Sequence, residues 1–409
     1  MKEDDSQKPI HGPYALMPFC PFPLPVDKQT KVTMNLDDEK YMRQAIALAL
    51  KGTGRVNPNP LVGAVIVKGG RVIGEGYHQQ YGCPHAERNA LASCTESPAG
   101  ATIYVTLEPC CHHGTNPPCT EALIQAGVSR VVVGSADPNP LVAGKGIAQL
   151  KAAGIQVEEG CLQAECDAIN FIFFHYITTK QPYLALKYAM TADGKIACHT
   201  GASRWITGET ARHHVHQLRN KYAAIMVGTG TLLADDPELT CRIENGNNPV
   251  RIVCDTRLRT PLSATIVTTA KEIPTIIATC CQEEHWYKPY QEAGCQVWIL
   301  PSKKGVVDLQ ALMQRLGQEK IDSVLVEGGS QLNWSLLQEG LVQRVYTYIA
   351  PKIFGGDAAK SPVGGKGVDS PQEACLMKVV STQQLGDDFL LEQEVVSSCH
   401  SADGSCNQH

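Results

Sequence analysis

Residues 84–87 of the chain read Pro-His-Ala-Glu, residues 107–110 read Leu-Glu-Pro-Cys, and residues 117–119 read Pro-Pro-Cys. His85, Cys110 and Cys119 are residue types that bind zinc, and three protein ligands leave the fourth tetrahedral position open for water. Zinc lowers the pKa of such a water towards ~7, so that hydroxide is available at neutral pH. The pattern therefore predicts one catalytic zinc ion per chain, held by these three side chains.

Glu87 follows the histidine by two residues and is not needed as a ligand. A glutamate beside the metal can carry a proton from water to a ring nitrogen and then to a departing amine. A histidine, a glutamate two residues on and a later Pro-Cys…Cys pair are the working parts of a zinc-dependent base deaminase. In mid-helix two such residues would point to nearly opposite sides. We therefore expect them in a first helical turn, with Pro84 as an early helix residue, and Cys119 at another helix start.

A structural zinc site is the alternative, because such sites use four protein ligands. Cys111, His112 or His113 could supply the fourth ligand. This alternative gives no role to Glu87, and we favour the catalytic site.

Helical and strand-like segments alternate around these motifs. This alternation predicts an α/β sandwich with helices on both faces of a sheet. The expected elements are a helix over residues 36–50, a hairpin from 61–67 and 71–73, a helix from about 84, a strand over 102–107, a helix from 118 and a strand over 130–134.

The pattern restarts at residues 180–182, and no internal repeat is present. We therefore expect two different α/β domains, over residues 37–180 and 181–393. Residues 1–36 are expected to be a disordered extension and residues 394–409 a loose tail. The strands expected in the second domain cover residues 183–190, 223–227, 250–254, 275–278, 297–300, 323–326 and 345–349.

The composition narrows the partners and the compartment. Lys plus Arg is 36 and Asp plus Glu is 41, a balance of 36 − 41 = −5, which gives no basic footprint for nucleic acid. No window approaches the ~18 apolar residues of a membrane span, so no membrane partner is expected. The 17 cysteines follow no regular spacing and favour reduced thiols in a cytoplasmic enzyme.

Three segments of the first domain carry a resemblance to a known family: residues 57–64 (Asn-Pro-Asn-Pro-Leu-Val-Gly-Ala), 85–87 (His-Ala-Glu) and 108–119. The domain resembles the cytidine-deaminase superfamily and, more narrowly, the bifunctional riboflavin-biosynthesis deaminase/reductase family. The nine-residue step from Cys110 to Cys119 separates this family from deaminases that use Pro-Cys-x-x-Cys. Cys111 stands where the family usually has serine. The resemblance implies a three-layer α/β/α fold and implies that Asn59 and His78 contact the pyrimidine substrate.

The second domain contains no G-x-G-x-x-G segment after a strand, so a Rossmann nicotinamide site is not supported. Residues 327–330 (Glu-Gly-Gly-Ser) instead link the expected strand 323–326 to a helical stretch, 331–337. Backbone amides at such a helix start can bind phosphate. Taken alone, this segment favours a plain loop, and the Asp-Gly-Lys turn at 193–195 is equally generic.

Several segments in order resemble the reductase half of the same family: 186–187, 193–197, 203–207, 228–231, 234–237, 249–253 and 327–329. That half is similar to dihydrofolate reductase in fold and uses NADPH, and the whole resemblance covers residues 37 to 393. The NADP contacts that it implies are Ala189, Trp205, Thr231, Asp235, Thr256, Gly329 and Ser330. The substrate contacts that it implies are Ser203, Arg219, Leu239, Arg242 and Glu327.

Physical roles can be given to some of these residues. Arg219 and Arg242 can form forked, charged hydrogen bonds to a ribose 5′-phosphate, although a single arginine is more often a solvated surface residue. Lys187 and Asp235 are the candidates for protonating the sugar carbonyl during hydride transfer.

The resemblance implies a bifunctional enzyme. The first domain would deaminate 2,5-diamino-6-ribosylamino-4(3H)-pyrimidinone 5′-phosphate, and the second would reduce the ribosyl group of 5-amino-6-(5-phosphoribosylamino)uracil to ribityl with NADPH. A homo-oligomer is expected from the family. A nucleic-acid base deaminase with an appended domain and a non-catalytic zinc module remain as rivals. The acidic balance speaks against the first rival, and Glu87 against the second.

Overall fold

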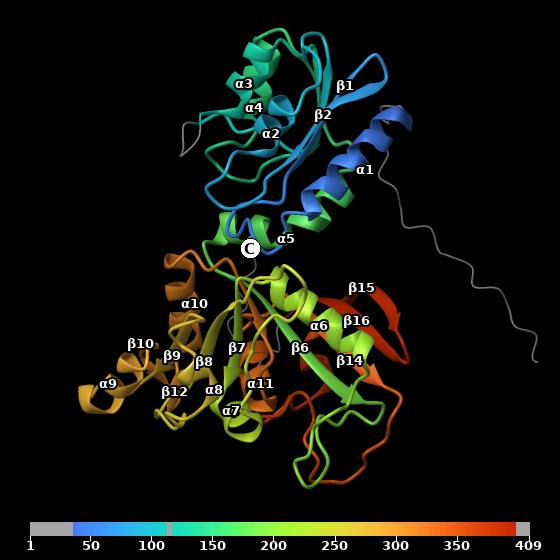
Figure 1. Cartoon of the computed structure of the whole chain (residues 1–409). Helices are drawn as coiled ribbons and strands as arrows, with labels where there is room; N and C mark the ends of the chain where they lie inside the picture. Colours follow the sequence, from blue (N-terminus) through green and yellow to red (C-terminus); the bar gives the residue numbers. More distant parts are fainter. Residues whose placement is uncertain (1–35, 113–116, 398–409) are drawn as a thin grey trace, which may run out of the picture. The chain divides into compact units, whose positions relative to one another are not determined.

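The computed structural model describes residues 36–112 and 117–397, which belong to one compact unit. The expected N-terminal extension up to residue 35 and the expected tail from residue 398 lie outside the described residues. Two separate sheets, of five and nine strands, organise the described chain (Figure 1). The predicted α/β class is confirmed.

The five-stranded sheet has the order β2-β1-β3-β4-β5. β1 is antiparallel to β2 and β3, whereas β3, β4 and β5 are parallel to one another. The strands are β1 (Gly63–Lys68), β2 (Arg71–Tyr77), β3 (Thr102–Leu107), β4 (Arg130–Ser135) and β5 (Gln156–Glu158). The helices around it are α1 (Leu36–Leu50), α2 (Ala86–Ala92), α3 (Cys119–Ala126), α4 (Lys145–Ala152) and α5 (Gln163–Thr179).

Helices cover both faces of this sheet, because alternate residues of each strand point to opposite sides. Ile103 and Val105 pack with α2, α3 and α4 in one buried cluster. On the other face, α1 contacts β1 and β3, and α5 contacts β4. The expected three-layer α/β/α arrangement is therefore present.

The nine-stranded sheet has the order β10-β9-β8-β7-β13-β6-β14-β16-β15. Its strands run parallel from β10 to β14, and β16 and β15 add an antiparallel hairpin. The strands are β6 (Tyr183–Thr191), β7 (Ala224–Gly228), β8 (Val250–Cys254), β9 (Thr275–Thr279), β10 (Gln296–Ile299), β13 (Ser323–Val326), β14 (Arg344–Ala350), β15 (Leu376–Leu385) and β16 (Asp388–Ser397). The remaining elements are α6 (Glu209–Lys221), α7 (Thr229–Asp235), α8 (Thr265–Thr268), α9 (Glu284–Glu292), the small hairpin β11 (Ser302–Lys303) and β12 (Val306–Val307), α10 (Leu309–Gln318), α11 (Ser330–Gln338) and the 3-10 turn η1 (Pro371–Glu373).

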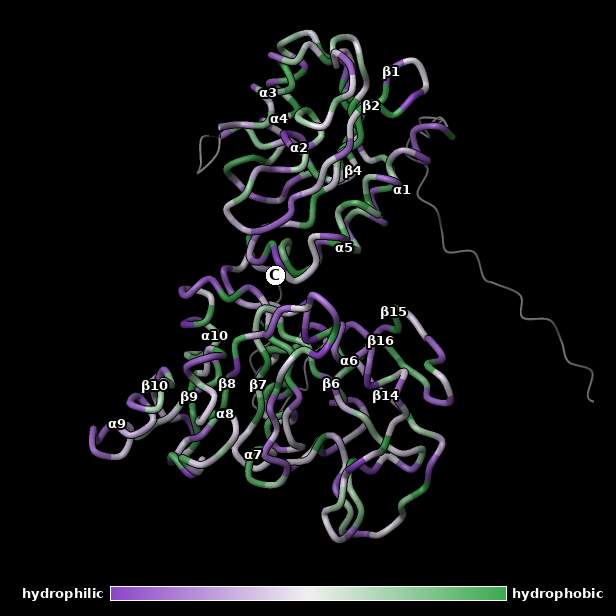
Figure 2. Tube along the Cα trace, in the orientation of Figure 1, coloured by the Kyte–Doolittle hydropathy of each residue, from purple (hydrophilic) through white to green (hydrophobic). Residues whose placement is uncertain are grey.

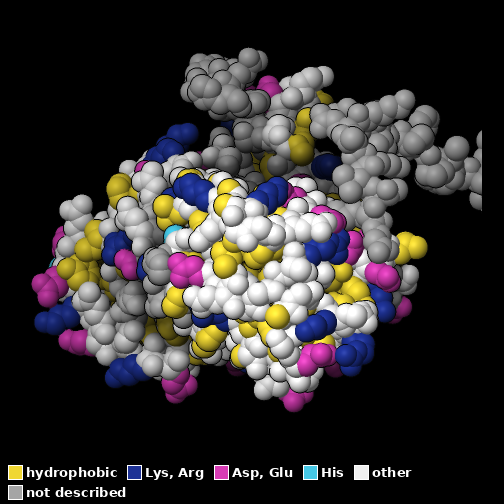
Figure 3. Space-filling view, turned by 90° about the horizontal axis from the view of Figure 1, so that it is seen from above, with side chains coloured by type: hydrophobic (Ala, Val, Ile, Leu, Met, Phe, Trp, Pro, Cys, Tyr) yellow, Lys and Arg dark blue, Asp and Glu magenta, His cyan; other side chains and the backbone are white. Residues whose placement is uncertain are grey.

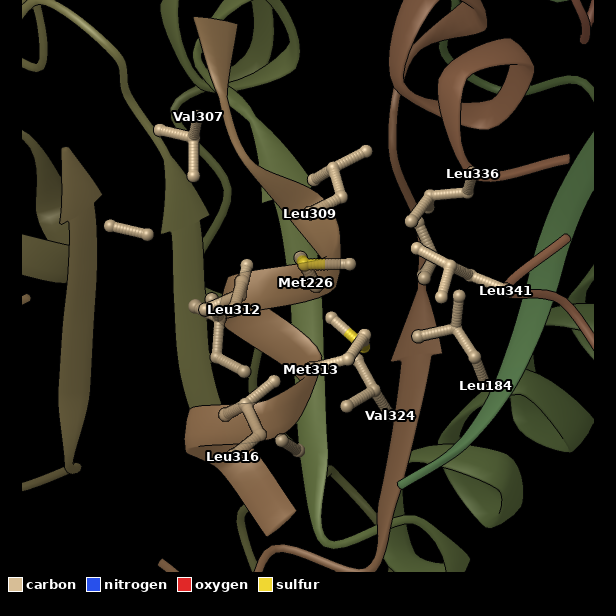
Figure 4. Close-up of a cluster of buried hydrophobic side chains, with 14 of the residues drawn as sticks. Leu184, Met226, Val307, Leu309, Leu312, Met313, Leu316, Val324, Leu336 and Leu341 are labelled. Atoms are coloured by element: carbon tan, nitrogen blue, oxygen red, sulfur yellow. The ribbon is translucent and has the colours of Figure 1, made fainter. Parts of the chain in front are cut away.

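The central strands of this sheet are apolar on both faces, as parallel strands between helices require. Figure 2 shows the hydrophobic stretches along these strands. Leu184 and Met226 face α10 and α11 in one cluster (Figure 4). The neighbouring residues Ala185 and Ile225 face α6 and α7–α9, respectively, in two clusters on the other side.

Three details differ from the sequence-based expectations. Pro84 is not an early helix residue, because His85 is the N-cap and the helix begins at Ala86. Residues 394–397 were wrongly assigned to a loose tail. They continue β16, where Glu394 pairs with Arg344 across the ladder. The helix α5 and the hairpin β15–β16 were not predicted.

Replacing Leu312 by alanine tests the packing between α10 and the nine-stranded sheet. This side chain is fully buried, so its truncation should cost about 2–5 kcal/mol of stability. Tryptophan fluorescence during urea unfolding reports on this part alone, because all four tryptophans (Trp205, Trp286, Trp298 and Trp334) follow residue 180.

Leu262→Ala is the control, because Leu262 is 48% exposed and its truncation should change stability by no more than about 0.5 kcal/mol. Equal shifts of the unfolding midpoint in the two variants would contradict this packing.

Candidate active sites

His85, Cys110 and Cys119 converge at one end of the five-stranded sheet. The Nδ1 atom of His85 lies 3.5 Å from the Sγ atom of Cys110 and 3.4 Å from that of Cys119. All three ligand atoms lie within 4.8 Å of one another. A tetrahedral zinc ion with Zn–N of about 2.0–2.1 Å and Zn–S of about 2.3 Å separates nitrogen from sulfur by roughly 3.5 Å. The three side chains therefore fit zinc.

Local structure explains why the three ligands meet. His85 is the N-cap of α2, and Cys119 is the first residue of α3 after Pro118. Cys110 follows the buried strand β3 by three residues. The backbone N–H of Cys119 donates to the Cys110 sulfur at 3.4 Å, so the start of α3 stabilises a thiolate there.

Hydrogen bonds among the two thiols and the histidine shift their pKa values. A hydrogen bond from the Cys119 thiol, together with one from His85, lowers the pKa of Cys110 to about 4. The hydrogen bond between His85 and the Cys110 sulfur also raises the pKa of His85 above its ordinary value. The pair therefore holds at least one thiolate at neutral pH, which is the form that binds metal.

Glu87 lies in the first turn of α2 and is only 3% exposed. Burial raises its pKa to about 7, and the neighbouring Cys110 adds to the increase. A carboxyl group with this pKa can both accept and release a proton near neutral pH. Glu87 and His85 line the same cavity, with a volume of about 370 Å³.

Asn59 and His78, the substrate contacts that the resemblance implies, line this cavity too. The Nδ2 group of Asn59 donates to Nε2 of His78 at 3.1 Å. The other ring nitrogen of His78 lies 3.2 Å from the carbonyl oxygen of Pro84. Burial lowers the pKa of His78, which favours the neutral ring that this arrangement requires.

Glu108 fixes the chain next to Cys110, a role that the sequence did not indicate. Its Oε2 atom accepts from the backbone N–H groups of Asp137 and Gly144, at 3.4 and 3.0 Å. Its Oε1 atom accepts from the N–H groups of Gly146 and Ile147, at 3.0 and 3.2 Å. The end of β3 is thus bound to the start of α4.

Further cavity residues also escaped prediction. Burial raises the pKa of Asp137 to about 6, and the Nδ1 atom of His112 is buried without a hydrogen-bond partner in the described chain. Both groups are available to a polar ligand. The polar segment 137–139 directly after strand β4 was the signal that could have found the first of these. The unpredicted polar, aromatic and basic lining residues include His112, Asp137, Asn139, Tyr81, Phe173, Tyr176 and Lys320.

The structural-zinc alternative finds no fourth ligand among the described residues. The Cys111 sulfur contacts the carbonyl oxygen of Leu141 at 4.0 Å and is not part of the ligand group. His112 is not part of the group either, and His113 lies outside the described residues.

A second cavity of about 540 Å³ lies at the carboxyl ends of the central strands of the nine-stranded sheet. Glu327, directly after β13, is the carboxylate that the cations Arg219 and Lys187 of this cavity contact. Arg219 donates to both carboxylate oxygens of Glu327, at 2.7 and 3.0 Å, and the Lys187 ammonium lies 3.4 Å away. Burial alone would raise the pKa of Glu327, but these two cations hold it well below its ordinary value.

This geometry changes the expected role of Arg219. The Nε and Nη2 groups of Arg219 already donate to Glu327. Its Nη1 group donates to the carbonyl oxygen of Thr240 at 2.9 Å. Arg242 is half-exposed at the cavity and pairs with Glu238 at 3.0 Å, which leaves it freer to bind a ligand. Burial and these two arginines lower the pKa of His216 to about 4, so His216 is neutral.

The residues expected to contact NADP do not share a single cavity. Ala189 and Trp205 line the cavity of Glu327, together with Ser203, whose hydroxyl lies 3.3 Å from the carboxylate of Asp235. Thr256 lines another cavity, of about 470 Å³, with Arg257 and Arg259.

Gly329 lies between the elements that carry these residues, as the N-cap of α11. A side chain there would come within 3.0 Å of the Thr231 hydroxyl, and Ser330 begins the helix. Leu239 is buried and does not line either cavity.

Family models match both parts of the chain. Residues 35–135 match the cytidine and deoxycytidylate deaminase zinc-binding region, and residues 182–391 match the RibD C-terminal domain. The riboflavin biosynthesis protein RibD of Actinobacillus pleuropneumoniae is 54% identical over 376 residues, covering 92% of this chain and 99% of that protein. RibD of Escherichia coli is 41% identical, covering 87% of this chain and 99% of that protein.

Solved structures agree with these relatives. A deaminase/reductase from Thermotoga maritima, named for diaminohydroxyphosphoribosylaminopyrimidine and 5-amino-6-(5-phosphoribosylamino)uracil, superimposes with a TM-score of 0.79 at 40% identity. Acinetobacter baumannii RibD superimposes with a TM-score of 0.80 at 37% identity, and each covers 88% of this chain and 99% of its own. Because the similarity extends over both sheets and over nearly the whole length of these proteins, the chain belongs to the RibD family of riboflavin biosynthesis proteins.

Proposed function

We propose that the chain catalyses two consecutive reactions on one pyrimidine ribosyl phosphate. The first is hydrolytic deamination of 2,5-diamino-6-ribosylamino-4(3H)-pyrimidinone 5′-phosphate, with release of ammonia. The second is NADPH-dependent reduction of the ribosyl group of 5-amino-6-(5-phosphoribosylamino)uracil to ribityl. The observation that carries the proposal is that His85, Cys110 and Cys119 meet at a cavity that the buried acid Glu87 also lines.

The two reactions are assigned to the two sheets. Residues 37–180 would form the deaminase domain, and residues 181–393 the reductase domain. Separate buried clusters around each sheet support this division, as do the two family models.

In the deaminase site, the ligand set supports zinc held by His85, Cys110 and Cys119. When bound, zinc supplies a Lewis acid and activates water. Glu87 would accept one proton from the attacking water and pass it to the ring nitrogen, and would then carry the remaining hydroxyl proton to the leaving amine, which its pKa of about 7 permits. Asn59 and His78 orient the pyrimidine, and Asp137 and Asn139 add polar contacts on the same wall.

In the reductase site, the Glu327–Arg219 pair forms the rigid floor on which the substrate binds. Arg242 binds the 5′-phosphate, and Ser203 and Glu327 contact the sugar. Lys187 and Asp235 are the candidate donors of the proton that accompanies hydride transfer. The Lys187 ammonium lies 3.4 Å from Glu327, at the wall of the cavity.

NADPH would lie across the strand ends between the two reductase cavities. Ala189, Trp205 and Asp235 would contact it on the substrate side, and Thr256 on the adenosine side. Thr231, Gly329 and Ser330 would hold the diphosphate between them, where the N–H groups at the start of α11 are available.

Nucleic acid and membranes are less well supported as partners than a small pyrimidine phosphate. On the face drawn in Figure 3, Lys/Arg and Asp/Glu side chains are intermingled, and the net charge is −5, whereas nucleic-acid binding favours a continuous basic surface. Among the described residues, no helix has the length and apolar run that crossing a bilayer requires. No disulfide joins any described cysteine, which supports our proposal of a cytoplasmic location.

The hairpin β15–β16 supports the proposal of a homo-oligomer. β15 is the edge strand of the nine-stranded sheet. Long apolar edges of this kind are usually covered by another chain. The exposed apolar side chains on the hairpin are Leu376, Met377, Val379, Val380, Phe389 and Val396.

Glu87→Gln should keep the zinc content of the protein and lose deamination by at least about a hundredfold, because the ligands are intact while the proton carrier is gone. Cys110→Ser should instead lower the zinc content. Elemental analysis and ammonia release, with and without a chelator, measure both effects.

Cys111→Ser is the matched control, because this adjacent thiol lies outside the ligand group and its loss should leave zinc in place. Glu87→Gln should also reduce the already deaminated substrate at a near-normal rate. A metal-free wild-type protein with full deaminase activity would overturn the assignment.

Arg242→Ala and Gly329→Val should separate the substrate phosphate from the cofactor. The first variant should lower kcat/KM for the sugar phosphate by roughly ten- to a hundredfold and leave NADPH affinity unchanged. The second should raise the KM for NADPH, because its side chain fills the space beside Thr231. Titrations of both ligands with both variants test this, and the opposite pairing of effects would reverse the two placements.

Val379→Glu should shift the proposed oligomer towards monomers, since it places a charge among the exposed apolar side chains of β15. Sedimentation velocity measures the change. Leu262→Glu, at an exposed position outside the hairpin, should leave the mass distribution unchanged. A wild-type protein that sediments as a monomer at all concentrations would contradict the oligomer.

A further inference from the structure

Lys320 is the only lysine or arginine among the described residues that line the deaminase cavity. It does not belong to the segment that matches the deaminase family model, which covers residues 35–135. It lies in the turn between α10 and β13, within the match to the RibD C-terminal domain. The wall of the deaminase cavity therefore includes a residue from the reductase half of the chain.

The position of this turn is fixed from one side by α5. The Lys320 backbone N–H donates to the carbonyl oxygen of Gly317 at 3.1 Å, and the Tyr176 hydroxyl donates to the same oxygen at 3.1 Å. Gly317 packs so closely that an added Cβ would lie 2.0 Å from the carbonyl oxygen of Lys180. Tyr176 itself lines the cavity beside Lys320.

The other side of the turn is bound to the loop that carries Asn59. The Asn57 side-chain amide donates to both carboxylate oxygens of Asp322, at 3.0 and 2.8 Å. Asn57 precedes the cavity residues Pro58 and Asn59 directly. Lys320 is thus held between two contacts with the deaminase half, one through Tyr176 and one through Asn57.

The Lys320 ammonium has no hydrogen bond or ion pair within the described part of the chain, and the residue is exposed. Three carboxylates line the cavity: Glu87 is beside the zinc ligands, Glu108 is saturated by backbone N–H groups, and Asp137 accepts from the backbone N–H of Asn139 at 2.8 Å. The substrate must place its amino-bearing ring carbon at the zinc ligands. Its phosphomonoester, with about two negative charges, then needs a cation on another part of the wall.

We propose that Lys320 binds the 5′-phosphate of the pyrimidine substrate in the deaminase cavity, so that the reductase half completes the deaminase site. This inference rests on the proposed deamination and adds a contact that the zinc motif does not contain. Lysine binds phosphate as a mobile point charge, which suits a long side chain at the cavity rim.

The test compares deamination of the phosphorylated substrate with that of the corresponding nucleoside, which has no phosphate. Lys320→Gln should lower kcat/KM for the phosphorylated substrate by about tenfold, mainly through KM, as expected for one partly exposed charged contact. The nucleoside should react equally well with variant and wild type. Lys320→Arg should retain most of the lost efficiency, and inorganic phosphate should inhibit Lys320→Gln more weakly than wild type.

Lys304→Gln is the matched control. Lys304 is also exposed and has a positive φ, of 52° against 61° for Lys320, but it does not line the deaminase cavity. It should leave both deaminations unchanged. Reduction of the already deaminated substrate should be normal in Lys320→Gln.

Two outcomes would overturn the inference while the proposed function stands. One is an unchanged kcat/KM for the phosphorylated substrate in Lys320→Gln. The other is an equal loss for substrate and nucleoside, which would mean that Lys320 only shapes the cavity. By contrast, absence of ammonia release by the zinc-loaded wild-type protein from either compound would refute the proposed deamination itself.

Discussion

The buried carboxylate of Glu108 is the constraint on which the deaminase site depends. Its two oxygens accept four backbone N–H groups, so the chain after β3 cannot move relative to the start of α4. The packing leaves no space for adjustment: a Cβ at Gly146 would lie 2.1 Å from the carbonyl oxygen of Pro109, the residue before Cys110. The backbone N–H of Asp137 donates to the same carboxylate. One buried charge therefore positions both the zinc ligand Cys110 and the part of the cavity wall that carries Asp137. Removing it would leave four backbone donors, three of them in buried hydrogen bonds, without this partner, which is costly in a dry interior.

The second site uses a carboxylate in the same structural position but satisfies it differently. Glu327 follows β13 as Glu108 follows β3, and in each case the strand pairs with a parallel neighbour. Ligand sites in α/β folds form at such carboxyl ends of strands, where the loops diverge. The charge of Glu108 is stabilised by backbone N–H groups, and this residue holds the end of β3 against the start of α4. Glu327 is neutralised by Arg219 and Lys187, whose remaining N–H groups stay available to a ligand.

The sequence predicted the parts of the molecule whose signal is local. Helix 36–50 and strand 102–107 have the predicted bounds, because the pattern of apolar residues along the chain defines them. The zinc ligands could be predicted because metal coordination restricts both residue type and spacing. The place of Lys320 in the cavity wall could not, because this residue reaches the cavity through the tertiary fold. The hydrogen bonds between Arg219 and Glu327 could not be predicted for the same reason, because the two residues are 108 positions apart in the chain.

The two proposed phosphate contacts, Lys320 and Arg242, have a physical rationale. The deaminase reaction requires the pyrimidine ring to face zinc, whereas the reductase reaction requires the sugar carbon to face the nicotinamide. A single phosphate anchor could serve both only if the two sites shared one cavity, and the zinc ligands and Glu327 line different cavities. The intermediate must therefore release one phosphate contact and form another. Exposed cations such as Lys320 and Arg242 suit this exchange, because a partly solvated ion pair is specific enough to orient the ligand and weak enough to let it leave. The strand β13 begins directly after Asp322, whose carboxylate accepts from Asn57, and it ends directly before Glu327. The same strand therefore supports the wall of the deaminase cavity and the floor of the reductase cavity.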